Sequence, residues 1–85
     1  MSYEVKYDPK AVKQLEKLPK DIARRIVKRM RQVSEDGRGI ETLKDEQYGF
    51  KVRVGNYRVI IDLSYNPSII WVRVIDHRGR VYKRL

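Results

Sequence analysis

The chain has 85 residues, with 20 Lys and Arg against 11 Asp and Glu, which gives a formal net charge of +9 and a sequence pI near 10.0. This length allows one small domain with a thin core, over residues 1–85, and excludes a second domain. The absence of cysteine and the single histidine, His77, exclude disulfides and thiolate metal sites and argue against a metal or any other cofactor.

The basic excess favours a polyanionic partner, of which nucleic acid is the leading candidate. The alternative is that the charge serves only solubility, or stability at high temperature. The longest apolar runs, 59–61 and 69–72, are far shorter than a bilayer span requires. The N-terminus also lacks the apolar region of a signal peptide, so we expect a cytoplasmic protein without a membrane partner.

The first residues predict a strand followed by a helix. Apolar and polar residues alternate over 2–7, which predicts a short strand with one face against the core. Asp8 supplies an N-cap and Pro9 a first helical residue, so a helix of about ten residues should begin there and end before Pro19. Its apolar side should consist of Ala11, Val12, Leu15 and Leu18.

A second helix is predicted to begin at residues 19–21 and to form an αα-hairpin with the first. Its remaining positions are mostly basic, and the glycines in 36–39 should end it. Its apolar stripe, at i, i+4 spacing, should consist of Ile22, Ile26, Met30 and Val33, with Val27 beside it.

The rest of the chain predicts a sheet. Residues 40–49 should form a connection with Leu43 as its core anchor, and strands are expected over about 50–54, 57–63 and 69–75. The short turns between these strands imply an antiparallel meander. The expected fold is α+β: an N-terminal strand, an αα-hairpin and a three-stranded antiparallel meander that completes one sheet, with the helices packed on one face.

Basic residues alternate with apolar ones in the predicted sheet. Lys51 and Arg53 should lie roughly 7 Å apart on the face away from the helices. Arg58 is expected there with them, and Arg73 could join them. Cations converging on one surface can form a phosphate clamp. Alternatively, they only protect an exposed sheet face from aggregation.

The tail after the last predicted strand contains His77, Arg78 and Tyr82. With the central basic segment, it resembles the RelE/ParE superfamily of toxins from bacterial and archaeal toxin–antitoxin pairs, and specifically its RelE-like ribonuclease branch. The similarity extends over nearly the whole chain and is carried most specifically by 50–59 and 77–82. The segments 11–19 and 43–44 also match, although any basic amphipathic hairpin would match the helical part.

The resemblance implies a ribosome-dependent endoribonuclease, or mRNA interferase, that cuts messenger RNA in the A site without metal. It also implies a RelB-like antitoxin that neutralises the toxin and an operator DNA bound by the pair. The site residues that it implies are Lys51, Arg53, Arg58, Arg78 and Tyr82. The two alternatives are a ParE-like inhibitor of DNA gyrase and a non-catalytic nucleic-acid-binding or operon-repressor subunit.

Metal-free cleavage would use the ribose 2′-hydroxyl as nucleophile, and it needs a base, an acid and cations for the phosphorane-like charge. Neutral Lys51 or the phenolate of Tyr82 could be the base, if nearby cations lower their pKa values. Tyr82 could instead stack on an RNA base. Arg53 stands where relatives often have lysine, which removes a titrating group. Some relatives use a carboxylate base, for which this chain offers Asp45, Glu46 and Asp62.

Overall fold

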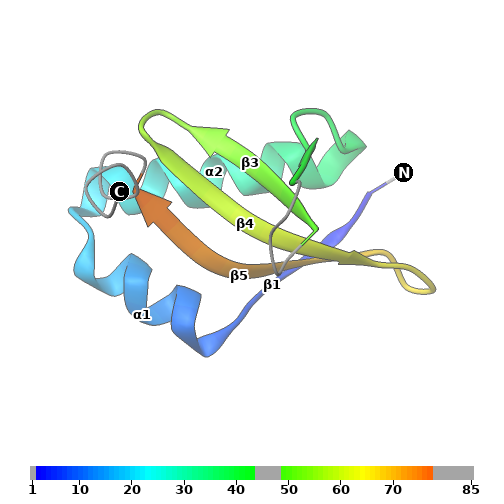
Figure 1. Ribbon diagram of the computed structural model, residues 1–85, viewed down its shortest axis with the longest axis horizontal. Coiled ribbons are helices and arrows are strands. Elements are labelled where there is room, and N and C mark those ends of the chain that lie inside the picture. Colours follow the sequence, from blue (N-terminus) through cyan, green and yellow to red (C-terminus); the bar gives the residue numbers. More distant parts are fainter. Residues whose placement is uncertain (1, 44–48, 78–85) are drawn as a thin grey trace.

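The computed structural model describes residues 2–43 and 49–77. The chain begins with a strand and two consecutive helices, and four further strands follow (Figure 1). Their bounds are β1 (Glu4–Tyr7), α1 (Pro9–Lys17), α2 (Lys20–Asp36), β2 (Glu41–Thr42), β3 (Phe50–Val54), β4 (Tyr57–Ser64) and β5 (Ile69–His77). The predicted α+β class is confirmed.

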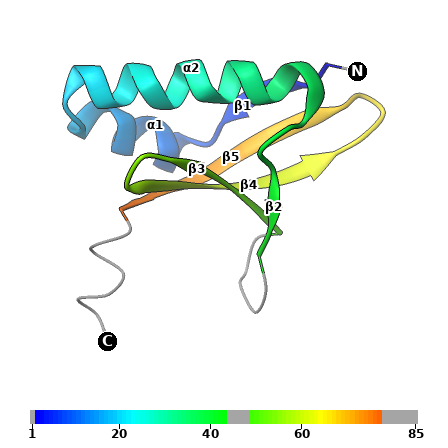
Figure 2. The same cartoon turned by 90° about the horizontal axis from the view of Figure 1, so that it is seen from above.

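One five-stranded sheet carries the fold, in the order β1-β5-β4-β3-β2. Strands β2 to β5 are antiparallel neighbours, and β1 pairs with β5 in parallel. Both helices lie on one side of the sheet, as Figure 2 shows. The opposite side, here called the open face, is free of helices among the described residues.

The start of α1 and the end of α2 follow from the residues found there, except that Asp8 does not cap α1 as predicted. Pro9 is the first helical residue of α1, as predicted, but Asp8 at the N-cap makes no capping hydrogen bond with its side chain. Gly37 ends α2 in the left-handed conformation, at φ 79°, and donates its N–H to the carbonyl of Val33. Glycine adopts this conformation without steric cost, which explains the stop at this position.

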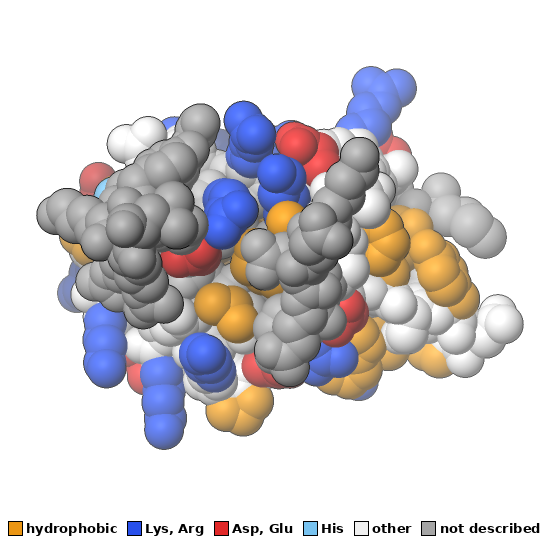
Figure 3. Space-filling view, viewed as in Figure 1, with side chains coloured by type: hydrophobic (Ala, Val, Ile, Leu, Met, Phe, Trp, Pro, Cys, Tyr) orange, Lys and Arg blue, Asp and Glu red, His pale blue; other side chains and the backbone are white. Residues whose placement is uncertain are grey.

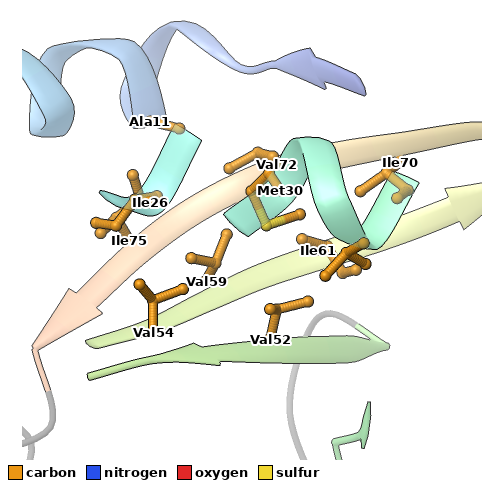
Figure 4. Close-up of a cluster of buried hydrophobic side chains, with 11 residues drawn as sticks. Ala11, Ile26, Met30, Val52, Val54, Val59, Ile61, Ile70, Val72 and Ile75 are labelled. Carbon is orange, nitrogen blue, oxygen red and sulfur yellow. The ribbon is translucent and has the colours of Figure 1, made fainter. Parts of the chain in front are cut away.

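The core lies between the helices and the sheet (Figure 4). Ile26, Met30 and Val33 of α2 are fully buried, as the predicted stripe requires. They pack against alternate residues of the strands, namely Val52, Val54, Val59, Ile61, Ile70, Val72 and Ile75. The prediction for α1 is wrong at Val12, which is 40% exposed, because the helix buries Ala11 and packs Leu15 and Leu18 on the core.

The connection before the sheet contains a strand that the pattern did not predict. β2 has only two residues, and they pair with Phe50 and Lys51 of β3. Ile40 is the residue of this segment that packs on the core. Leu43, the predicted anchor, is only half-buried and instead donates its backbone N–H to the carbonyl of Gly49.

An irregularity in β5 decides which side chains reach the open face. Ile61 pairs with Val72, but the preceding residue of β4, Ile60, pairs with Val74, so Arg73 is an extra residue in the ladder. Such a bulge changes the alternation along the strand. Ile75 is therefore buried beneath the helices, and Asp76 is Cα partner to Arg58.

Candidate active site

Three of the predicted site residues are brought together on the open face. Arg53 of β3 and Arg58 of β4 are Cα partners across the hairpin, and Lys51 lies two residues before Arg53. The turn between these strands is Gly55–Asn56, and Gly55 has φ 58°, as a type II′ turn requires of its first central residue. Figure 3 shows Lys and Arg side chains gathered on this face, with carboxylates beside them.

Arg58 lies at the centre of the group and is held by a carboxylate. Its Nη2 donates a hydrogen bond of 2.9 Å to Oδ2 of Asp76, and both side chains are mostly shielded from solvent. The Nε atom of Arg58 is buried and has no hydrogen-bond partner among the described residues. Because buried donors are nearly always paired, this N–H is an exception that the described residues leave without an acceptor.

Lys51 and Arg53 share a second carboxylate more loosely. Nζ of Lys51 is 3.9 Å from Oε1 of Glu41, and Nε of Arg53 is 3.8 Å from Oε2 of the same residue. These distances exceed a hydrogen bond, and Glu41 is half-exposed on β2. An anionic ligand can therefore compete with Glu41 for both cations at little energetic cost.

Arg73 is also on the open face, but its cationic group is already occupied. Nη1 donates to both carboxylate oxygens of Asp8, at 3.0 and 3.2 Å, and Nε donates to Oδ2 of Asp62 at 3.1 Å. Its guanidinium also lies 5.2 Å from the ring centroid of Trp71. Burial alone would lower the pKa of Arg73, but its hydrogen bonds to Asp62 and Asp8 and their charges raise the pKa overall.

This network explains why Asp8 does not cap α1, and it gives Arg73 a structural role. Replacing Arg73 by alanine should lower the free energy of unfolding by about 1 to 2 kcal/mol, because two partly buried carboxylates lose their partner. Urea denaturation of the variant measures the change. An unaltered midpoint would show that the network adds no stability.

The remaining predicted residues have mixed outcomes. Arg78 and Tyr82 lie outside the described residues, as do Asp45 and Glu46. Asp62 is engaged, since its Oδ1 accepts the backbone N–H of Gly49 while Oδ2 binds Arg73. The ring of His77 stands edge-on to that of Tyr57, with centroids 4.7 Å apart.

Sequence reasoning missed both carboxylates that hold the cations. Asp76 is 18 residues from Arg58 along the chain, and only the register after the bulge makes them partners. Glu41 lies on a strand too short to give an alternation signal. Within 2–43 and 49–77, no group of three His, Asp or Glu residues could hold a metal ion, and no helix is long and apolar enough to cross a membrane.

The family model described as the ParE toxin of the type II toxin–antitoxin system, parDE, matches residues 5–82. A search among curated proteins found no match.

Solved structures that resemble this chain also come from toxin–antitoxin systems. A chain of the toxin–antitoxin complex RelBE2 from Mycobacterium tuberculosis is 27% identical with a TM-score of 0.81, and the match covers 92% of this chain and 100% of that one. A chain of the archaeal RelE–RelB complex from Pyrococcus horikoshii OT3 is 28% identical with a TM-score of 0.70, and the coverage is 94% and 99%.

The isolated RelE toxin of E. coli shares the fold. It is 22% identical with a TM-score of 0.75, over 98% of this chain and 94% of that chain. The family match and the fold agree with the resemblance inferred from the central basic segment. The chain therefore belongs to the ParE toxin family of the RelE/ParE superfamily, and it is a RelE-like toxin of a type II toxin–antitoxin system.

Proposed function

We propose that this toxin is a ribosome-dependent, metal-independent endoribonuclease that cleaves messenger RNA in the A site. The observation that supports the proposal best is the group formed by Lys51, Arg53 and Arg58 on the open face, in which Arg58 has a buried N–H without a described partner. Like charges directly opposite each other destabilise a sheet. That Arg53 faces Arg58 despite this cost favours a role in binding an anion.

The proposed reaction is an attack of the ribose 2′-hydroxyl on the adjacent phosphorus. The O–P bond to the 2′-oxygen forms, the bond to the 5′-oxygen breaks, and the products are a 2′,3′-cyclic phosphate and a free 5′-hydroxyl. Negative charge on the phosphate oxygens rises along this path, and fixed guanidinium groups stabilise it more than they stabilise the starting diester. Arg58 and Arg53 are assigned this role.

Two proton transfers accompany the attack. One proton leaves the 2′-hydroxyl and another reaches the 5′-oxygen. Lys51, whose side chain is only 17% exposed, is a candidate base in its neutral form, and Tyr82 is the alternative. Arg78 is proposed to stabilise charge on the phosphate or the leaving oxygen, since a guanidinium is a poor acid.

The test is translation of a defined message in a cell-free system with the purified toxin, followed by primer extension. New 5′ ends within the codon held in the A site are the expected result. A folded sample that gives no new ends would contradict the proposal. A DNA gyrase supercoiling assay with the same sample then distinguishes the ParE-like activity, which requires inhibition of gyrase without RNA cleavage.

We further propose a cognate antitoxin as the protein partner. The relatives from Mycobacterium tuberculosis and Pyrococcus horikoshii were solved as toxin–antitoxin complexes. A partner with acidic segments would complement the net charge of +9. The toxin–antitoxin pair is the species proposed to bind operator DNA.

A further inference from the structure

A second basic surface lies around the edge of the sheet from the candidate active site. It is a groove of about 330 Å³ between α2 and the end of β3. Arg25, Lys28 and Arg29 line it from α2, and Arg53 lines it from β3. No carboxylate contributes to this lining among the described residues, so we call these four side chains the groove cations.

The helix spacing aligns the three groove cations of α2 along one stripe. Arg25 and Arg29 are four residues apart and Lys28 is three residues after Arg25, so their side chains are neighbours on the surface of α2. Neighbours of this kind have Cβ atoms roughly 5 to 6 Å apart, which is similar to the step between phosphates along a nucleic-acid strand. Of the described carboxylates, none forms an ion pair with Arg25, Lys28 or Arg29.

The guanidinium groups of Arg25 and Arg29 each occupy space next to a glycine that a Cβ atom would restrict. A Cβ atom at Gly55 would lie 3.3 Å from Nη2 of Arg25, and one at Gly39 would lie 2.5 Å from Nη2 of Arg29. Both glycines also have positive φ, at 58° and 95°. The arginines therefore lie against bare backbone at the two ends of the stripe.

Arg53 connects this groove to the open face. It lines the groove and is also the Cα partner of Arg58. β2 pairs only with Phe50 and Lys51, so the edge of β3 at Arg53 has no described strand beside it. A chain of phosphates bound at Arg58 can thus continue past Arg53 to α2, and on the way it would displace Glu41 from its loose contact with Arg53.

We propose that the groove binds the phosphate backbone of single-stranded RNA, as an extension of the strand held at the candidate active site. The inference extends the proposed ribonuclease function, although binding here needs no cleavage. A cleft lined by one sign of charge concentrates polyanions. Val54 is the only apolar side chain in the described lining, so the groove offers little surface to anchor a peptide.

The experiment measures binding of a fluorescein-labelled 2′-O-methyl RNA of roughly a dozen nucleotides to the free toxin at several salt concentrations. This RNA lacks the attacking hydroxyl, so binding is measured apart from cleavage. The double variant Arg25→Ala/Arg29→Ala should bind about tenfold more weakly. Its slope of log affinity against log salt should fall by about 1.4, because each lost contact to a single strand removes about 0.7.

A matched control removes the same charge elsewhere. Lys10→Ala/Lys13→Ala deletes two exposed cations of α1 and should change the slope by much less. Equal losses in the two double variants would overturn the proposal, as would wild-type binding by the groove variant. Arg25→Gln/Lys28→Gln repeats the test if the first variant does not fold.

Two further measurements separate the inference from its rivals. Polyglutamate should compete weakly, and competition equal to that of RNA would assign the groove to an acidic protein instead. If the groove variant loses RNA binding but the wild-type toxin cuts no message, the groove assignment stands and the proposed ribonuclease function fails.

Discussion

Replacing Arg58 by alanine should lower the rate of message cleavage by about 10²- to 10³-fold. Removal of one preorganised hydrogen-bond donor that stabilises the charge developing in the transition state typically has an effect of this size. Arg58 is the best-placed donor of the described group, because Asp76 fixes one nitrogen of its guanidinium at 2.9 Å while the buried Nε has no described partner. Cleavage should be measured on programmed ribosomes with the toxin in excess, so that a single turnover is followed.

Two variants control this experiment. Arg58→Lys keeps the charge but loses the planar fork, so its rate should lie between those of the wild type and Arg58→Ala. Arg24→Ala removes an exposed cation from α2 and should leave the rate unchanged. Cleavage by Arg58→Ala at the wild-type rate would show that Arg58 takes no part in the reaction. If Arg24→Ala lowered the cleavage rate as much as Arg58→Ala does, the loss would reflect the net charge of the protein and not a specific role of Arg58.

Replacing Ile61 by alanine should lower the free energy of unfolding by about 2 to 5 kcal/mol, because it leaves a cavity in a packed core. Ile61 is fully buried in β4 and belongs to the cluster between sheet and helices. Small domains have only about 5 to 15 kcal/mol of stability in total. The variant should therefore unfold at a much lower urea concentration, with an unchanged dependence of free energy on urea.

Val12→Ala is the matched control, since Val12 is 40% exposed and its truncation should change the free energy of unfolding by less than about 0.5 kcal/mol. If both variants lost similar amounts of stability, the cluster around Ile61 would not be the dominant core. Circular dichroism before each titration checks that the variants start folded.

Most of the fold was predictable because its signals are local. The apolar stripe of α2 repeats every turn, and Gly37 ends the helix where the pattern stops. The alternation of Val52 and Val54 with Arg53, followed by a glycine turn, predicts both the hairpin and its buried face. These features depend on neighbours within a few residues, so the sequence displays them directly.

The parts that could not be predicted depend on pairing between distant segments. Asp8 has the sequence context of an N-cap, but its carboxylate instead meets Arg73, 65 residues further along. The partnership of Arg58 with Asp76 likewise requires the register of β4 and β5. Of the five site residues inferred from the resemblance, three are brought together and the roles of all five stay predictions; Arg78 and Tyr82 lie outside the described residues.

The extra residue at Arg73 lets β5 hold an ion-pair network on its outer face without changing which side chains it buries. Before Arg73 the inward residues are Ile70 and Val72, and after it the inward residue is Ile75. The two-residue alternation of inward and outward side chains is therefore interrupted once within the strand. Losing Arg73 would bring Val72 and Ile75 to the two-residue spacing of a regular strand, so both would stay inward, while Asp8 and Asp62 would lose the cation that they share. Among relatives of this toxin, a β5 that is one residue shorter should therefore occur together with replacement of the carboxylates at positions 8 and 62.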